Sequence, residues 1–383
     1  MKLQQLITEL ETKEKPAFQN PQFQVKKDAF FQGRLAETPD SELTLEAGEI
    51  RLAVQQFAYT SNNITYAILG NRMNYWQFFP AAEAATDWGV IPVWGFAEIV
   101  ASNVEELAVG ERIFGYFPPA KQIKMRPVGI KQKRFIDGSE HRSSLPAGYN
   151  VYTRVKYETG YDATFDQARM LLFPLHITSY FIWDMLQENN WYGAEQIIIL
   201  SASSKTSTGL GYALQADKNA PKTVGVTSAS HLASVEQINI YDQCFTYEQI
   251  EEIDTSIPSL IVDMSGNAKV LLALHRQLAD NMKFTLNVGL THWMNASAKP
   301  LEGMITARSQ FFFVPAQIQK RMKEWGVETY HHKTTAFLKA TALKSKAWLN
   351  FRVLDSLEAL AAVHPEVCEG KIPATEGIIV DLM

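Results

Sequence analysis

A turn rich in hydroxyl groups is the part of this sequence with the clearest chemistry. It follows the apolar run 197–200, and eight of the next nine residues are small or hydroxylated, the exception being Lys205. The pattern predicts a buried strand, a tight turn and then a helix. The first amides of a helix lack partners within it, and the helix dipole adds positive charge there. We therefore expect the turn to bind an anion, above all a phosphate.

The turn does not follow either common phosphate-binding motif. A Walker A loop is excluded because no glycine precedes Lys205 at the required spacing, and a G-x-G-x-x-G fingerprint is absent. Polar side chains would then supply the contacts that glycine amides give elsewhere. The alternative is a turn that kept its fold and lost its ligand. The candidate contacts are Ser203, Ser204, Lys205, Thr206 and Ser207.

Composition excludes several classes of function. The chain has 383 residues, 20% of them charged, and a net charge of -5, so nothing indicates a nucleic acid or an anionic membrane as partner. Two cysteines, Cys244 and Cys368, exclude a disulfide scaffold and a four-cysteine zinc site. The N-terminus lacks the apolar core of a signal peptide, and no run of about 18 apolar residues occurs. We expect a cytoplasmic protein.

Hydrophobic patterns predict two kinds of sheet. Alternating or glycine-punctuated segments predict antiparallel strands of a small barrel at 23–25, 49–54, 89–100 and 110–117. Short apolar runs separated by helix-length spacers predict a doubly wound parallel sheet, with strands at 197–200, 222–228, 242–245, 260–266 and 284–290. Helices are expected at 1–15, 64–69, 164–186, 315–326 and 334–360, and a last strand at 377–383.

The segment 118–156 is locally basic. It carries nine Lys and Arg residues against Asp137 and Glu140. Charge runs are commonly solvated surface, so a solvated loop is the first interpretation. The alternative is a lid that attracts an anionic substrate or a cofactor phosphate.

Two motifs add a family resemblance. Val109-Gly-Glu-Arg-Ile113, after the strand Trp94-Gly-Phe-Ala-Glu-Ile-Val100, resembles the V-G-D-R-V pair of the GroES-like domain in medium-chain dehydrogenase/reductases, and 171–181 resembles the segment before their cofactor-binding sheet. The order of segments resembles the zinc-independent quinone oxidoreductase and enoyl reductase branches, with an atypical, degenerate glycine turn. The resemblance implies an α/β fold with a GroES-like β-barrel domain at 1–160, carrying the basic insertion 118–156. It also implies a Rossmann doubly wound parallel sheet at 161–310, and a segment 311–383 that returns to the barrel.

The resemblance also implies a cofactor. Family members that bind NAD place an acid after the second strand, whereas this chain has Thr227 and Ser228, which favours NADP. An ordinary hydroxyl-rich helix cap is the alternative. Ser265 and Gly266 resemble the turn after the fourth strand, and Gly289 resembles the turn beside the nicotinamide. Plain strand-end turns would look the same.

The catalytic residues implied by the resemblance are Asn62, Asn63 and Tyr66. They lie where zinc-free relatives carry an Asn or Tyr that faces the nicotinamide and can bind an enolate oxygen. Helix capping is the alternative for both asparagines, and a core aromatic for Tyr66. No zinc-ligand pattern is present, because 95–98 lacks the histidine of the zinc enzymes.

These features together predict an NADP(H)-dependent, zinc-independent oxidoreductase that reduces an enone, quinone or ketone. Two alternatives stay open: a non-catalytic nucleotide-binding or scaffold protein, and an enoyl reductase that acts on carrier-bound acyl chains through the basic segment. We expect a small-molecule substrate, and a homodimer with its interface at 292–305 by analogy with the family.

Overall fold

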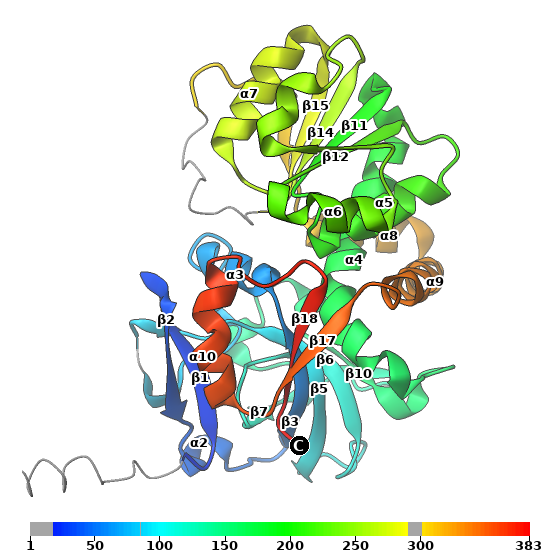
Figure 1. The fold of residues 1–383 in the computed structure, drawn as a ribbon. Helices are drawn as coiled ribbons and strands as arrows, with labels where there is room; N and C mark the ends of the chain where they lie inside the picture. Colours follow the sequence, from blue (N-terminus) through cyan, green and yellow to red (C-terminus); the bar gives the residue numbers. More distant parts are fainter. Residues whose placement is uncertain (1–17, 85, 290–300) are drawn as a thin grey trace, which may run out of the picture.

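The computed structural model describes residues 18–84, 86–289 and 301–383, and it contains two sheet-based units joined by the long helix α4 (Asp166–Glu188) (Figure 1). The helix expected at 1–15 lies outside the described residues. No helix in the described part of the chain is long and apolar enough to cross a membrane.

The first unit is a mixed sheet of nine strands with a three-stranded sheet beside it. The large sheet has the order β17-β18-β3-β5-β6-β10-β9-β8, with β7 against β3, and the small sheet has the order β2-β1-β4. The strands are β1 (Pro21–Lys26), β2 (Ala29–Glu37), β3 (Ile50–Tyr59), β4 (Trp88–Gly89), β5 (Val93–Ser102), β6 (Arg112–Phe117), β7 (Gln122–Met125), β8 (Pro127–Val128), β9 (Arg134–Asp137), β10 (Val151–Arg154), β17 (Asn350–Leu354) and β18 (Glu376–Asp381).

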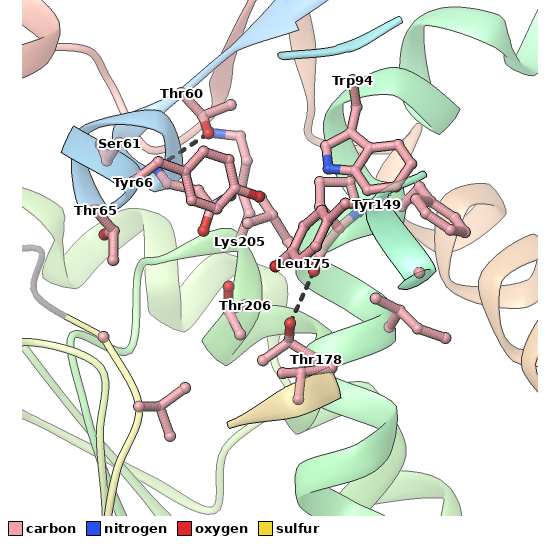
Figure 2. A pocket seen from close by; sticks show the side chains of 18 of the residues that line it. Thr60, Ser61, Thr65, Tyr66, Trp94, Tyr149, Leu175, Thr178, Lys205 and Thr206 are labelled. Atoms are coloured by element: carbon pink, nitrogen blue, oxygen red, sulfur yellow. Dashed lines mark hydrogen bonds between the residues drawn. The ribbon is translucent and has the colours of Figure 1, made fainter. Parts of the chain in front are cut away.

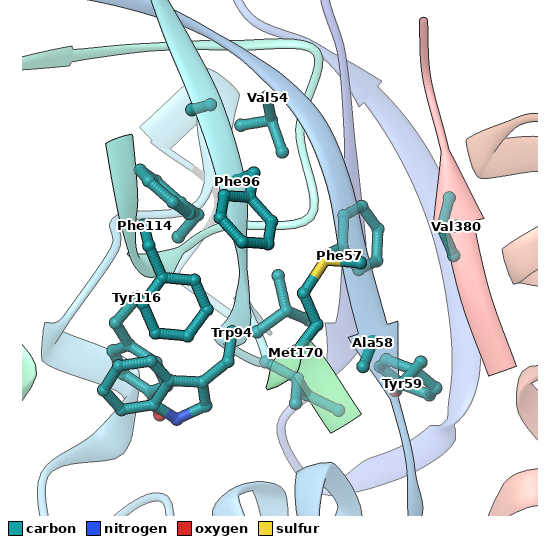
Figure 3. Close-up of a cluster of buried hydrophobic side chains, with 14 of the residues drawn as sticks. Val54, Phe57, Ala58, Tyr59, Trp94, Phe96, Phe114, Tyr116, Met170 and Val380 are labelled. Carbon is teal, nitrogen blue, oxygen red and sulfur yellow. The ribbon is translucent and has the colours of Figure 1, made fainter. Parts of the chain in front are cut away.

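Glycine and aromatic residues explain how the central strands of this sheet pack together. Strands β5 and β6 pair antiparallel, from Val93 opposite Phe117 to Glu98 opposite Arg112, which confirms the predicted pair of strands. A Cβ atom at Gly95 would lie 2.3 Å from the carbonyl oxygen of Gln56, so only glycine lets β5 approach β3 this closely. Figure 3 shows the core beneath, where Phe57, Phe96 and Phe114 pack together.

The second unit is the predicted parallel sheet. Its order is β13-β12-β11-β14-β15-β16, in which the first strand of the unit, β11, lies at the centre, as in doubly wound dinucleotide-binding folds. Successive residues of β11 alternate between two cores: Ile197 and Ile199 belong to one, and Ile198 and Leu200 to the other. Its strands are β11 (Gln196–Leu200), β12 (Lys222–Thr227), β13 (Gln243–Thr246), β14 (Ser259–Asp263), β15 (Met282–Asn287) and β16 (Ser309–Phe311).

Helices cover both units. Besides α4 they are α2 (Asp40–Leu43), α3 (Ser61–Ile68), α5 (Lys205–Ala216), α6 (Ala229–Ile238), α7 (Ala268–Leu278), α8 (Val314–Trp325), α9 (Val327–Ser345) and α10 (Leu357–Cys368). The single helix expected over 334–360 is wrong. Helix α9 ends at Ser345, and the chain then forms β17 and begins α10. The cause is tertiary, because Asn350–Leu354 pairs in parallel with β18.

The last strand returns to the first unit, as predicted. Strand β18 lies between β17 and β3 and pairs antiparallel with β3, Ile379 being opposite Ala58. The segment that leads into β18 passes over the edge of the second unit, and it lines the site described next.

Candidate functional site

A cavity of about 590 Å³ lies between the two units (Figure 2). Such a volume is in the range of small-molecule sites. One wall comes from the turn after β11 together with Met264, Val288 and Gly289, and the other from α3, β5, β6 and the first half of α4. Residues of α8 and α9 and of the segment before β18 complete the lining. It therefore meets the carboxyl edge of the parallel sheet, where doubly wound folds bind their ligands.

The turn after β11 has the predicted strand, turn and helix. Ser201, the first residue after the strand, has a left-handed φ of 60°, a conformation that glycine adopts without cost and that costs other residues on the order of 1 kcal/mol or more. Ser204 caps helix α5, because its hydroxyl oxygen accepts a hydrogen bond of 3.1 Å from the amide of Ser207. Lys205 is the first residue of the helix.

The side chain of Lys205 crosses the cavity wall to the C-terminal segment. Its ammonium donates to the carbonyl oxygens of Ala374, at 3.1 Å, and Glu376, at 2.7 Å. Burial lowers the pKa of Lys205 to about 8, while the charge of Glu376 opposes that shift. The cavity thus has a buried cation that is held by neutral carbonyl groups, and an anionic ligand would bind it more strongly.

Four of the five candidate contacts of this turn line the cavity, and one does not. Ser203, Ser204, Lys205 and Thr206 line the cavity, but the side chain of Ser207 is buried in the cap of α5 and lies outside it. Two glycines of the helix serve packing instead of a phosphate. A Cβ at Gly209 would lie 2.6 Å from the hydroxyl of Ser179 on α4, and one at Gly211 would lie 2.8 Å from Ile240.

The turn after β12 supports the cavity from behind. Thr227 is buried and donates to the hydroxyl of Ser203 at 3.1 Å, and Ser228 is the N-cap position of α6; neither lines the cavity. His231, which the sequence patterns did not single out, does line it and lies 3.3 Å from the hydroxyl of Ser203. Burial and the charge of Lys205 lower the pKa of His231, so this ring is neutral near pH 7.

Of the two further turns, only one reaches the cavity. Ser265 and Gly266 lie outside it and donate to the buried carboxylate of Asp263, in an ordinary strand-end turn. Gly289 lines the cavity, and a Cβ there would lie 2.6 Å from the carbonyl oxygen of Met264. Gly289 therefore lets the chain after β15 pass close to the chain after β14.

The two asparagines of α3 have different places. Asn63 does not line the cavity: its amide donates to the carbonyl of Pro92 at 2.8 Å and its oxygen accepts from the amide of Thr60, which is a capping box. Thr60, and neither asparagine, is the N-cap residue. Asn62 lines the cavity together with Tyr66. Capping, the alternative left open by the sequence, thus accounts for Asn63.

The hydroxyl of Tyr66 is a neutral donor. Burial raises the pKa of Tyr66, and the nearby polar groups of Asn62, Trp94 and Tyr116 only partly oppose it. Figure 2 shows Tyr66 on the barrel side of the cavity, opposite Thr206 and Thr178. Asn62 and Tyr66 can therefore hydrogen-bond an oxygen atom of a bound molecule from this side.

The basic segment is not a solvated loop. Five of its nine basic side chains form ion pairs inside the barrel unit, namely Lys124, Arg126, Arg142, Arg154 and Lys156. Arg142 is fully buried against Asp137, at 3.2 Å. Arg134 lines the cavity, where its guanidinium lies 3.1 Å from the ring of His331. Acids of the barrel unit thus compensate most of the charge of this segment.

The described residues contain no group of three or more His, Cys, Asp or Glu side chains placed to hold a metal ion. The expected dimer segment, 292–305, lies mostly outside the described residues.

The model of one protein family matches residues 57–373, and this family is described as "Protein of unknown function (DUF2855)". The chain belongs to it. A comparison with curated proteins gives no match.

Solved structures match along nearly the whole chain. CurA from Vibrio vulnificus in complex with NADPH is 15% identical, with 91% of this chain and 94% of that chain covered and a TM-score of 0.60. YhdH from E. coli K-12 with bound NADPH is 12% identical, with 94% and 100% covered and a TM-score of 0.56. A mutant form of the enoyl thioester reductase from Candida tropicalis is 14% identical, with 94% and 99% covered and a TM-score of 0.53. These likenesses confirm the predicted GroES-like and Rossmann fold.

Proposed function

We propose that the protein is an NADP(H)-dependent oxidoreductase that reduces an enone, quinone or ketone without zinc. The observation that carries the proposal is the buried cation Lys205 in a turn that also places Ser203 and Thr206 on the wall of a cavity, at the carboxyl edge of a parallel sheet. The fold supports it, because two structures of this fold contain NADPH.

The residues on this wall fit a dinucleotide. Lys205 provides positive charge for a pyrophosphate, and the hydroxyls of Ser203 and Thr206 can donate to its oxygens. No carboxylate follows β12, where it would repel a 2′-phosphate, because Ser228 occupies that position. Gly289 keeps the wall beside β15 thin enough for a flat ring to lie against it.

A bound nicotinamide would supply the hydride in this chemistry. Asn62 and Tyr66 then hydrogen-bond the oxygen on which negative charge develops, as a metal ion does in other reductases. Both groups are neutral. The amide of Asn62 carries no charge, and burial raises the pKa of Tyr66. Aromatic rings form part of the barrel wall, and apolar surface of this kind would limit the water beside the reacting atoms.

A titration of the full chain with NADPH, followed by cofactor fluorescence, tests the proposal. We expect saturation below about 1 mM, the upper end of ordinary enzyme affinities, and weaker binding of NADH. Oxidation of NADPH with a panel of enones, quinones and ketones then tests turnover. Absence of NADPH binding at about 1 mM contradicts the proposal. Binding without turnover of any compound in the panel favours the nucleotide-binding alternative.

The cytoplasmic location and the homodimer expected from the sequence remain predictions within this proposal. Sedimentation of the purified chain tests the dimer.

A further inference from the structure

Six aromatic side chains form the barrel end of the cavity, and we refer to them as the aromatic box. They come from α3 and the segment after it, from β5 and β6, from the segment before β10 and from α4. Neighbouring rings are in contact: the centroids of Tyr66 and Tyr75 lie 4.7 Å apart, and those of Trp94 and Phe173 lie 4.9 Å apart. The box consists of Tyr66, Tyr75, Trp94, Phe114, Tyr149 and Phe173, all of which line the cavity.

The box contains an unsatisfied donor. The side chain of Trp94 is 9% exposed, and its indole nitrogen finds no hydrogen-bond acceptor in the described part of the chain. Figure 2 shows this nitrogen on the edge of the indole ring that faces Tyr66 and Tyr149. An indole N–H can only donate, and a buried donor without a partner is costly. A molecule in the cavity that offers an acceptor atom would remove this cost.

A second donor lies in the same box. The hydroxyls of Tyr75 and Tyr149 lie 3.1 Å apart, and one donates to the other. Two hydroxyl protons and one mutual bond leave one proton for another acceptor. Burial raises the pKa of both phenols, so both stay protonated.

The box selects against a charged occupant. None of its six side chains carries a charge. Arg169 lies over the ring of Phe114 at 3.9 Å and forms a two-point ion pair with Glu158, at 2.6 and 2.8 Å, and Arg142 is paired with Asp137. An anionic group placed among the rings would lose its hydration without gaining a free counterion. Flat, neutral molecules pack best between aromatic faces.

The rigidity of the box is set by the buried arginine of the basic segment. The guanidinium of Arg142 donates to the backbone carbonyl of Tyr149 at 3.0 Å and to the side chain of Asn150 at 2.7 Å. Asp137 pairs with it at 3.2 Å. Arg142 therefore acts as a positioning residue that holds Tyr149 in the box.

We propose that the substrate carries a second acceptor oxygen on a flat, uncharged part, and that Trp94 binds this oxygen and thereby determines specificity. The inference rests on the proposed function for the reacting group. Asn62 and Tyr66 suffice for the two lone pairs of one carbonyl oxygen, so the donors of Trp94 and of the Tyr75–Tyr149 pair are available to an additional acceptor. A saturated acyl chain has no such oxygen.

Two probes that differ in one atom test this proposal. Both are benzylideneacetone, one with a para acetyl group and the other with a para isopropenyl group, so that a carbonyl oxygen in one is a CH₂ group in the other. Their dissociation constants are measured by calorimetry in the presence of NADP, which cannot reduce them, and their kcat/KM values are measured with NADPH. The readout is the preference for the acetyl probe. It is calculated once as the ratio of the two dissociation constants and once as the ratio of the two kcat/KM values.

We expect the wild-type protein to prefer the acetyl probe about tenfold, as for one neutral hydrogen bond in a buried site. Trp94→Phe, which keeps a ring and removes the N–H, abolishes most of that preference, and Tyr149→Phe reduces it. The matched control is Phe173→Leu, which alters the box without removing a polar atom and weakens both probes equally.

Three outcomes overturn the inference. One is a preference in Trp94→Phe within twofold of the wild-type preference. Another is an equal loss for both probes, which means that Trp94 acts only through the hydroxyl of Tyr66. In both cases the proposed function stands. A wild-type protein that binds NADPH but neither binds nor reduces either probe also overturns the inference, whereas absence of NADPH binding overturns the proposed function itself.

Discussion

The two walls of the cavity differ in charge and in the way that the chain assembles them. The turn wall, Ser203–Thr206, presents a cation and hydroxyls at the start of a helix, and it is built from four consecutive residues. The aromatic box presents neutral donors among rings, and it is assembled from separate elements of the barrel unit and α4. The cavity is therefore electrostatically polarised. A charged ligand belongs at one end and an uncharged one at the other.

The largest expected effect concerns Asn62, which we propose binds the oxygen atom on which negative charge develops. We expect Asn62→Ala to lower kcat about 10²–10³-fold, since a donor to a developing oxyanion is lost. Asn63→Ala is the matched control, because Asn63 belongs to the capping box of α3 and donates to the carbonyl of Pro92. It lowers the free energy of unfolding by about 1–2 kcal/mol and leaves kcat nearly unchanged. Steady-state kinetics and thermal unfolding measure the two effects, and equal loss of kcat in both variants would contradict the assignment.

The next effect tests the charged end. Lys205→Met is expected to weaken NADPH binding about 10–100-fold, the value of a charge-assisted hydrogen bond. Binding of the probes to the aromatic box stays unchanged, because Lys205 is not one of its six residues. Lys218→Met, at an exposed position of the same unit, serves as control. A fluorescence titration that finds the same NADPH affinity in all three proteins would show that Lys205 does not contact the cofactor.

The smallest effect is a pH dependence of the same interaction. The pKa of Lys205 is lowered to about 8 by burial, below its ordinary value, and only the protonated form attracts an anion. NADPH affinity is therefore highest well below about pH 8 and falls, at most tenfold per pH unit, as pH rises through the pKa. His231 is neutral throughout this range, since its pKa is lowered. Dissociation constants between about pH 7 and 9.5 check this, and the fall should be absent in Lys205→Met.

The same division explains what the sequence could predict. The strand, turn and helix around Lys205 follow from neighbouring residues, so local patterns place them correctly. The roles of Ser207 and Asn63 did not follow, because helix capping turns their polar groups away from the cavity. Whether a hydroxyl faces a ligand or its own helix depends on a rotation of one bond, which residue order does not specify.

The aromatic box could not be predicted, because its members meet only through tertiary structure. In the sequence, Trp94 and Tyr149 are two of many aromatic residues. Arg142 is one of nine basic residues in its segment, and nothing in the sequence distinguishes it as the fully buried one. Pairing of Arg142 with Asp137 needs β9 and the following turn to be in place. Strand β17 was also not predicted from the sequence. Its only partner strand among the described residues begins 26 residues after Asn350, at Glu376.

The return of β18 to the barrel has a consequence during synthesis. Strand β3 pairs with β18 across a sequence separation of 325 residues, as between Gln56 and Asp381. A ribosome that adds about 5–20 residues per second needs roughly 15 to 65 s to cover this distance. Throughout that interval the part of β3 from Gln56 to Tyr59 has no partner on the edge that β18 later occupies, and unpaired strand edges are sites of intermolecular association. Chaperones that bind nascent chains would therefore have to protect this part of β3 after the parallel sheet is complete, since β16 ends at Phe311.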